Sequence, residues 1–345
     1  MIIYNPKSAI DMMEFGIGVA HSGSRASKIL AAVRASHGLG ERQAQWLYDE
    51  PIPPLTREDL LRVHSPDYVT LLLSNAPEPA IFETYELRDE YGNFNRYNPA
   101  KAVRPLSGLV ARTLEQMAGT SMAARRAMEN GFCFFLGGGM HHAYRDRGRG
   151  FCLLNDVVIA MRRMRAEGRA RRFFVIDLDC HRGDGTAALC LDDPDALTLS
   201  IHTAHGWPLD EPPFDDAGRL TPWRYPSDVD IPVPENAEDR YLPALAKGLA
   251  LLEELAFGEP CDMGMVVAGA DPYEEDELAS ASGVKLTLGR MLERDMYVYE
   301  WLRERNLPQC WVMAGGYGEN AWKPHANFIS TILPRLLRER EKEGS

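Results

Sequence analysis

The sequence contains no run of 18 consecutive apolar residues, no internal repeat and no low-complexity tract. The first absence excludes a membrane-spanning helix, and the other two exclude repeat, collagen-like and coiled-coil architectures. No long apolar segment follows the first residues, MIIYNPKSAI. We therefore expect no secretory signal peptide and a cytoplasmic protein.

The chain also lacks an excess of basic residues. It has 38 Lys and Arg against 50 Asp and Glu, which gives a formal net charge of −12. This balance argues against nucleic acid or an anionic membrane as the main partner. It mildly favours cationic partners, although solubility alone explains it. The oligomeric state is open, and an oligomer is compatible with the sequence.

Cysteines are few and scattered, without a CxxC pair. In a chain of 345 residues, the six cysteines indicate buried, reduced thiols and no disulfide framework. The hydrophobic share of 45% is enough for a large buried core.

Short apolar runs bounded by Gly, Pro or charged residues recur along the chain, and none alternates with polar residues. This pattern is typical of strands buried on both faces of a parallel sheet. It predicts strands at residues 2–4, 132–136, 173–178, 197–201, 263–268 and 310–314. Helical patterns between them predict helices at residues 24–36, 108–130, 157–167, 241–256, 285–305 and 327–343.

The alternation of strands and helices predicts one α/β domain over residues 1–345, with a mostly parallel central sheet flanked by helices. Gly131 is expected to end the second helix, and Asn155 and Asp156 to cap the third. Two stretches look irregular, the Pro-rich residues 208–234 and residues 76–106. A long irregular loop is often functional, and the first one suits a rim or lid.

The strongest chemical signal is the segment FFVIDLDCHRGDGTA, residues 173–187. Side chains two residues apart on a strand point the same way, so we expect Asp177, Asp179 and His181 to share one face where the strand ends. Buried carboxylates need a partner or a cation, and carboxylate with imidazole suits Zn²⁺. The alternative is a salt-bridge cluster at the end of the strand.

A second segment, FLGGGMHHAYRDRGRGFCLLND at residues 135–156, also follows a predicted strand. Its three glycines allow a sharp turn that delivers His141 and His142 together. Adjacent imidazoles are suited to proton transfer near neutral pH. Taken alone, such a pair is more often incidental, but it gains weight beside an acidic strand end.

Two further predicted strands end in glycine and then a polar residue. In VVAGADPYEEDELAS, residues 266–280, Asp271 completes an Asp-His-Asp set that leaves a zinc ion one open position, as catalytic zinc requires. Residues 274–277 are expected to form a solvated face of the loop. In CWVMAGGYGENAW, residues 310–322, Tyr317 can donate a hydrogen bond to an oxyanion, although alone it reads as a turn residue. Together the four segments predict metal-assisted hydrolysis.

These motifs resemble those of the histone deacetylase superfamily, which includes bacterial acetoin-utilisation-type and acetylpolyamine amidohydrolase proteins. The matching text, in family order, is GGGMHHA, GFCLLND, IDLDCHRGDGTA, LSIH, AGADPYEED and AGGYG, and RVHSPDYVTLL near residue 64 looks like the family's N-terminal segment. The resemblance implies the arginase/deacetylase fold. It also implies a zinc-dependent amidohydrolase that removes acetyl or other acyl groups from amines, such as acetyl-lysine in proteins or acetylated polyamines.

The resemblance also implies roles for individual residues. It assigns zinc binding to Asp179, His181 and Asp271, and binding of a potassium ion to Asp177, Asp179, His181, Ser200 and Ile201. It makes His142 the general base and acid, assisted by His141, with Asp177 and Asp184 orienting the two histidines. It implies that Tyr317 stabilises the transition state and that the carbonyl of Gly150 and the ring of Phe151 contact the substrate.

The chain departs from the family pattern in places. Arg182 stands where many relatives have a second histidine, which is not a ligand, so activity is expected to survive. Met140 and the loop at residues 206–226 are not assigned to a subfamily, and Trp207 is the best candidate for the second aromatic wall. Substrate identity and the choice between Zn²⁺ and Fe²⁺ stay open. The alternatives are a catalytically idle acyl-lysine-binding protein and an arginase-type ureohydrolase, whose second metal site is missing where Pro272 and Tyr273 follow Asp271.

Overall fold

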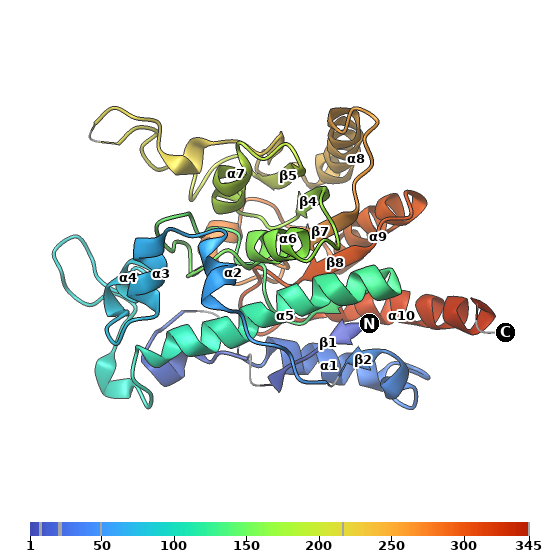
Figure 1. Cartoon of the computed structure of the whole chain (residues 1–345), viewed down its shortest axis with the longest axis horizontal. Coiled ribbons are helices and arrows are strands. Elements are labelled where there is room, and N and C mark those ends of the chain that lie inside the picture. The colour runs from blue at the N-terminus through green and yellow to red at the C-terminus, as the bar shows by residue number, and fades with distance from the viewer. Residues whose placement is uncertain (7–8, 20–22, 49, 216, 344–345) are drawn as a thin grey trace.

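Eight parallel strands form one sheet in a computed structural model that describes residues 1–6, 9–19, 23–48, 50–215 and 217–343 (Figure 1). The strands lie in the order β2-β1-β3-β8-β7-β4-β5-β6, and each neighbouring pair is parallel. They are β1 Ile2–Ile3, β2 Leu47–Tyr48, β3 Phe132–Phe135, β4 Phe173–Asp177, β5 Ala196–Thr203, β6 Val229–Val233, β7 Met263–Val267 and β8 Gln309–Val312. The predicted α/β class with a parallel central sheet is confirmed.

Helices cover both faces of this sheet. One apolar cluster joins the strands to α1 Arg25–Ala35, α8 Glu238–Leu255, α9 Leu288–Glu304 and α10 Lys323–Glu343. The other joins them to α2 Arg57–Leu61, α3 Pro66–Leu72, α4 Glu78–Thr84, α5 Gly108–Asn130, α6 Asp156–Ala166 and α7 Asp184–Cys190. Figure 1 shows α5 and α6 lying side by side.

The alternation of buried residues explains why the strands look apolar throughout. Phe132 and Phe134 of β3 pack into the first cluster, whereas Cys133 and Phe135 pack into the second. Both faces of the strand are therefore covered, as the unbroken apolar runs predicted. The six cysteines are free and buried, which confirms the expectation of reduced thiols.

The six strands and six helices predicted from the sequence are present. Strand ends differ by one or two residues and helix ends by up to four. Gly131 follows α5 with a φ of 74°, and the side chain of Asn155 accepts a hydrogen bond from the Val158 amide at the start of α6. Asp156 was expected to share in this cap, but it is the first helical residue and its carboxylate binds elsewhere.

The prediction of a fully irregular stretch at residues 208–234 was wrong at its end, because it contains β6. Pro232 lies inside this strand, in register with His202 of β5. A proline cannot donate to the ladder and is tolerated because β6 is the edge of the sheet. Likewise, residues 76–106 contain the short helix α4. Among the described residues, no helix is both long and apolar enough to span a bilayer.

Candidate active site

The four segments that carry chemistry follow four neighbouring strands. In the sheet order these are β3, β8, β7 and β4, so their carboxyl ends lie side by side along one edge. The glycine turn with the two histidines follows β3, and Tyr317 follows β8. Asp271 follows β7, and Asp179 with His181 follows β4. Parallel pairing is therefore what brings residues 141 to 317 of the sequence to one place.

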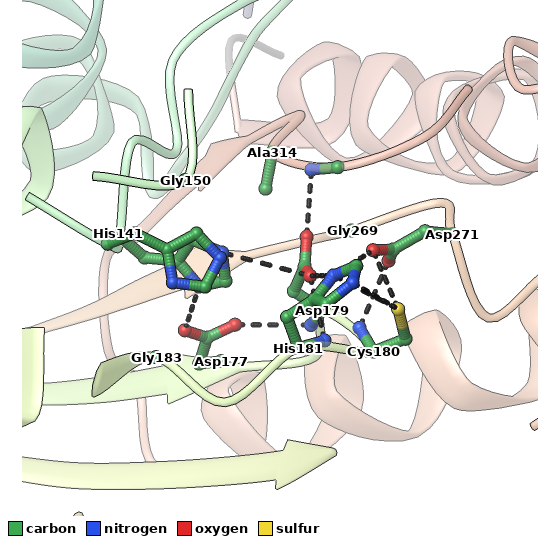
Figure 2. A network of polar contacts seen from close by, with 12 residues as sticks. His141, Gly150, Asp177, Asp179, Cys180, His181, Gly183, Gly269, Asp271 and Ala314 are labelled. Atoms are coloured by element: carbon green, nitrogen blue, oxygen red, sulfur yellow. Dashed lines mark hydrogen bonds and ion pairs between the residues drawn. The ribbon is translucent and has the colours of Figure 1, made fainter. Parts of the chain in front are cut away.

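Asp179, His181 and Asp271, here called the metal triad, converge at this edge (Figure 2). The Nδ1 atom of His181 is 3.2 Å from Oδ1 of Asp179 and 3.0 Å from Oδ2 of Asp271. The two carboxylates are fully buried and the imidazole nearly so. Together with the thiol of Cys180, their donor atoms lie within 4.8 Å of one another.

We expected Asp177, Asp179 and His181 to share one face of a strand, but only Asp177 lies in the strand. Strand β4 ends at Asp177, and Asp179 and His181 lie in the loop beyond it. That loop is shaped by its own hydrogen bonds, because Asp179 N donates to Asp177 Oδ1 at 3.1 Å and His181 N to Asp179 Oδ1 at 3.0 Å. A turn after β4 therefore places Asp179 and His181 relative to Asp177. The explanation by alternation along a strand was wrong.

The glycines around the triad have a steric role. Gly315 N donates to Asp179 Oδ2 at 2.8 Å. A Cβ atom at Gly315 would lie 2.4 Å from the same oxygen, closer than any side chain tolerates. The carboxylate can therefore meet the β8 turn only because no side chain stands there.

The electrostatics of the triad fit a cation. Burial lowers the pKa of His181, but its hydrogen bonds to Asp179 and Asp271 outweigh burial and raise it to about 10. Burial raises the pKa of Asp271, and the neighbouring Asp179 carboxylate raises it further. Two buried carboxylates thus strongly attract positive charge at this point. Oxygen and imidazole donors suit a divalent ion such as Zn²⁺.

The thiol of Cys180 belongs to the same cluster of donor atoms and contacts Asp271. The thiol donates to Asp271 Oδ2 at 2.9 Å, and the amide of Cys180 donates to Oδ1 of the same residue at 3.0 Å. Burial raises the pKa of the Cys180 thiol well above its usual range, so the thiol keeps its proton and serves as a donor. Cys180 therefore orients Asp271, a contact that sequence reasoning missed.

Each of the two adjacent histidines is held by its own carboxylate. The Nδ1 atom of His141 is 2.7 Å from Asp177 Oδ2, and Nδ1 of His142 is 2.6 Å from Asp184 Oδ1. The family resemblance implied that Asp177 and Asp184 orient these histidines, and the structure shows which histidine each carboxylate contacts. The hydroxyl of Tyr144 donates to the second oxygen of Asp184, which sequence reasoning did not anticipate.

The environments of the two histidines are opposite in effect. Burial lowers the pKa of His141, but the carboxylates of Asp177 and Asp179 outweigh burial and raise it to about 9. Burial and then the charge of His141 lower the pKa of His142 to about 4. Near neutral pH the protein alone thus favours a charged His141 beside a neutral His142. A bound dication would lower both values by its own charge.

Asp156 fixes the glycine turn that carries these histidines. Its carboxylate accepts hydrogen bonds from Gly139 N at 3.0 Å, from Met140 N at 2.7 Å and from the hydroxyl of Thr120. Gly139 has a φ of 86°, a left-handed conformation that favours glycine. Sequence reasoning missed this role, although the GFCLLND motif that ends in Asp156 was the available signal.

Tyr317 is positioned by a carboxylate that was expected to be solvated. Its amide donates to Asp276 Oδ2 at 2.7 Å. Asp276 is buried, and burial followed by the charge of Asp271 raises its pKa to about 7. The expectation of a solvated face at residues 274–277 was therefore wrong for Asp276, while the other three residues are exposed.

Two cavities meet at the site. An inner one of about 90 Å³ and an outer one of about 170 Å³ share five lining residues. These shared residues are His142, Gly150, Phe151, His181 and Tyr317. Trp207 lines the outer cavity, 4.6 Å from His142 between ring centroids. Gly150, Phe151 and Trp207 thus line the same cavity as His181 of the triad.

Two of the five residues expected at a potassium site, Asp179 and His181, belong to the triad, and the other three lie on β4 and β5. Asp177 of β4 is in register with Ser200 of β5, and Ile201 follows. The Ser200 hydroxyl accepts from Gly183 N at 3.2 Å. Arg182 points away from the triad, because its Nε donates to Asp230 of β6 at 3.1 Å.

Comparisons with known proteins agree on one family. A family model described as histone deacetylase domain matches residues 20–331. An uncharacterised protein of Picosynechococcus sp. is 32% identical over 292 residues, which cover 83% of this chain and 85% of that protein. Over 281 residues, histone deacetylase 2 of Arabidopsis thaliana is 28% identical and the acetoin utilization protein AcuC of Bacillus subtilis is 29% identical. These two matches cover 81% and 78% of this chain but only 65% and 66% of the relatives.

Solved structures show the same fold. An HDAC homologue from Aquifex aeolicus matches with a TM-score of 0.69 at 22% identity, and an HDAC homologue complexed with SAHA matches with a TM-score of 0.68 at 23% identity. Each match covers 97% of this chain and 83% of the other. At such identity the likeness establishes the fold alone.

Proposed function

The chain belongs to the histone deacetylase family, and from this we propose that it is a zinc-dependent amide hydrolase that removes acetyl or other acyl groups from amines. One observation carries the proposal. Two buried carboxylates and an imidazole converge beside two carboxylate-held histidines, and His142, His181 and Tyr317 line both cavities. A buried cluster of this kind at the meeting point of two cavities suits catalysis better than it suits stability.

The metal triad would hold the ion. When bound, a zinc ion supplies Lewis-acid polarisation of the acyl carbonyl and lowers the pKa of water. Cys180 and Gly315 keep the two triad carboxylates in place through donated hydrogen bonds. Such outer contacts fix the orientation of metal-binding groups and are important for affinity.

His142 would move the protons. Its low pKa leaves an unprotonated nitrogen, while Asp184 holds the other nitrogen at 2.6 Å and so fixes the tautomer. In this role His142 takes a proton from the attacking water and later gives it to the leaving amine. His141, which Asp177 holds at 2.7 Å, lies beside it and would assist this proton transfer.

Tyr317 would donate a hydrogen bond to that oxygen. Its pKa is raised well above the usual range, by burial first and then by the nearby triad carboxylates, so the phenol stays protonated. Gly150 and Phe151 would receive the amine side of the substrate in the outer cavity, opposite Trp207. The substrate classes that we propose are acetyl-lysine in proteins and acetylated polyamines.

The test is release of acetate by the purified protein loaded with Zn²⁺. An acetyl-lysine peptide and acetylputrescine are the substrates, and arginine is included as a probe of ureohydrolase activity. His142→Ala should abolish turnover. Asp184→Asn should lower kcat by roughly 10²–10⁴-fold, because an amide cannot enforce the same tautomer.

The matched control is His37→Gln, which changes an exposed histidine outside the site and should leave kcat unchanged. Urea from arginine would assign the arginase branch. Binding of the acetyl peptide without turnover, unaffected by His142→Ala, would assign a binding protein. Either result would overturn the proposal.

The metal and the potassium ion can be tested separately. Reconstitution of chelator-treated protein with Zn²⁺ or Fe²⁺ in parallel shows which ion restores kcat. We also propose that K⁺ binds beside the triad through Asp177, Asp179, His181, Ser200 and Ile201, where oxygen donors suit a hard cation. Exchanging K⁺ for tetramethylammonium at constant ionic strength should lower the Tm of the parent protein, and a Tm that does not change would refute this site.

A further inference from the structure

The loop formed by residues 204–215 and 217–228, here called the entrance loop, contributes Trp207 to the lining of the outer cavity. Figure 1 shows the described part of this loop, coloured yellow, above α4. Within the loop, Trp223 Nε1 donates to Pro212 O at 3.1 Å, and Thr221 N donates to Pro213 O at 3.0 Å. These bonds shape the loop but do not tie it to the site.

Arg149 provides such a tie. Its guanidinium lies against two indoles of the entrance loop, with Cζ 5.1 Å from the ring centroid of Trp207 and 4.3 Å from that of Trp223. The flat guanidinium is suited to this contact, because it stacks on aromatic faces as an ammonium group does not. The side chain of Arg149 is only 14% exposed, so water weakens these contacts little.

The charge of Arg149 lies between the loop and the active site. Nη2 is 2.7 Å from Oε1 of Glu211 in the entrance loop, and Nε is 3.9 Å from Oδ2 of Asp184, the partner of His142. Neither nitrogen has a well-oriented hydrogen-bond partner among the described residues. The attraction between Arg149 and the entrance loop therefore comes from charge and from stacking on the two indoles. Both depend on the position of the loop.

Hydrogen bonds hold the backbone of Arg149 in place, so its side chain contacts the entrance loop from a fixed position. Arg149 N donates to Cys152 O at 3.0 Å, and Cys152 N donates to Arg149 O at 2.8 Å. The next two residues, Gly150 and Phe151, have φ values of 52° and 66°. A left-handed phenylalanine is costly and persists only where its surroundings hold it in place.

The Trp207 ring of the entrance loop packs closely against residues of the active site. A Cβ atom at Gly150 would lie 2.4 Å from Cη2 of Trp207, so the indole already packs against this residue. Trp207 also lies 5.8 Å from His181 between ring centroids. A small outward movement of the loop would therefore widen the outer cavity directly beside the triad.

We propose that Arg149 is a positioning residue that clamps the entrance loop onto the site, so that Trp207 forms a fixed wall opposite Phe151 and the entrance admits only a slender, unbranched amine chain. This inference rests on the proposed function for its substrate side. The hydrogen bonds of the two histidine pairs do not involve Arg149. Loss of the clamp therefore raises KM and weakens discrimination against branched amines, with a smaller effect on kcat.

The first experiment measures selectivity. The substrates are a peptide with acetylated lysine and the same peptide with a methyl branch on the carbon that bears the acetylated nitrogen. Arg149→Met should raise KM for the first peptide about tenfold, as the competent fraction of the loop falls. It should lower the preference for the unbranched peptide by a similar factor. Arg149→Lys, which keeps the charge but not the planar stacking, should restore part of both effects.

A double-mutant cycle separates the clamp from general instability. Glu211→Gln should raise KM in the parent protein but add little in the Arg149→Met background, because the two residues act through one contact. The matched control is Arg147→Met. This residue lies two positions earlier, is more exposed, and pairs with Asp146 and Glu83 away from the entrance loop. The control should leave KM and selectivity unchanged.

The second experiment needs no catalysis. Trypsin cleavage after Arg224, whose Nη2 donates to Glu211 O at 3.0 Å, is followed in an Arg219→Gln background, so that cleavage reports opening of the entrance loop. The background substitution is needed because Arg219 in the same loop is 79% exposed and would be cut without any opening. Arg149→Met should speed this cleavage about tenfold relative to the parent and to Arg147→Met. If the parent releases no acetate, the proposed function fails, and the cleavage rates alone decide on the clamp. Unchanged KM, selectivity and cleavage in folded Arg149→Met, or in Glu211→Gln if the former does not fold, would overturn the proposal.

Discussion

His64 should make the stability of the folded protein depend on pH between about 6.5 and 4. The imidazole is buried, and both its nitrogens are engaged. Nδ1 is 2.8 Å from Tyr144 O, and Asn155 N donates to Nε2 at 3.1 Å. His64 thus connects the turn that carries His141 and His142 to the start of α6, and it must be neutral to accept from Asn155. Burial lowers the pKa of His64 to about 4.

The sign and size follow from linkage. Between pH 6.5 and about 4 the unfolded chain binds a proton at residue 64 and the folded protein does not, so the free energy of unfolding falls as the pH falls. At 1.36 kcal/mol per pKa unit, the full contribution is about 3 kcal/mol, and about 2 kcal/mol of it is lost between pH 7 and pH 5.

Urea unfolding at pH 7 and pH 5 measures this loss. Chelator is present so that pH-dependent metal binding does not contribute. In His64→Gln, the difference in unfolding free energy between the two pH values should shrink by about 2 kcal/mol relative to the parent. His37→Gln is the control, because it removes an exposed histidine and should leave the difference unchanged. Equal pH dependence in His64→Gln and the parent would refute the argument that His64 is buried as a neutral ring.

Three further perturbations address the site and its support. Asp156→Asn replaces one accepting oxygen by a donor that faces Gly139 N or Met140 N. The free energy of unfolding in urea should therefore fall by about 2 kcal/mol, and kcat should fall as well. A stable and fully active variant would contradict the role of Asp156 in the turn. Gly119→Ala would place a Cβ atom 2.2 Å from the buried ring of Phe135, so the urea midpoint should fall by an amount equivalent to roughly 1–3 kcal/mol, despite the better helix propensity of alanine. Removal of metal by EDTA should lower the Tm and stop acetate release, and Zn²⁺ should restore both; a chelator-insensitive Tm and activity would exclude the metal triad as a metal site.

Much of the site could be read from the sequence because each chemical group follows a strand. The Asp-x-Asp-x-His segment, the His-His pair, Asp271 and the Gly-Gly-Tyr turn all stand directly after apolar runs. In a parallel sheet these ends must lie at one edge, so their convergence follows once the strands are recognised. The edge strands β2 and β6 escaped recognition. The first is two residues long, and the second contains a proline.

The contacts that orient the site depend on groups distant in sequence. The thiol of Cys180 on Asp271, the amide of Tyr317 on Asp276 and the carboxylate of Asp156 on the glycine turn leave no periodic signal. Asp276 shows the difficulty, since it stands among exposed acidic residues and only the fold reveals that it is buried.

The sequence by itself determined the class of fold and the kinds of chemical group, because apolar periodicity and residue type are local properties of the chain. Tertiary structure alone decided which nitrogen meets which carboxylate. It also split the pKa values of His141 and His142, and set Arg149 between Glu211 and Asp184. Distances and burial control hydrogen bonds, desolvation and charge interactions, and these exist only after the chain has brought remote segments together.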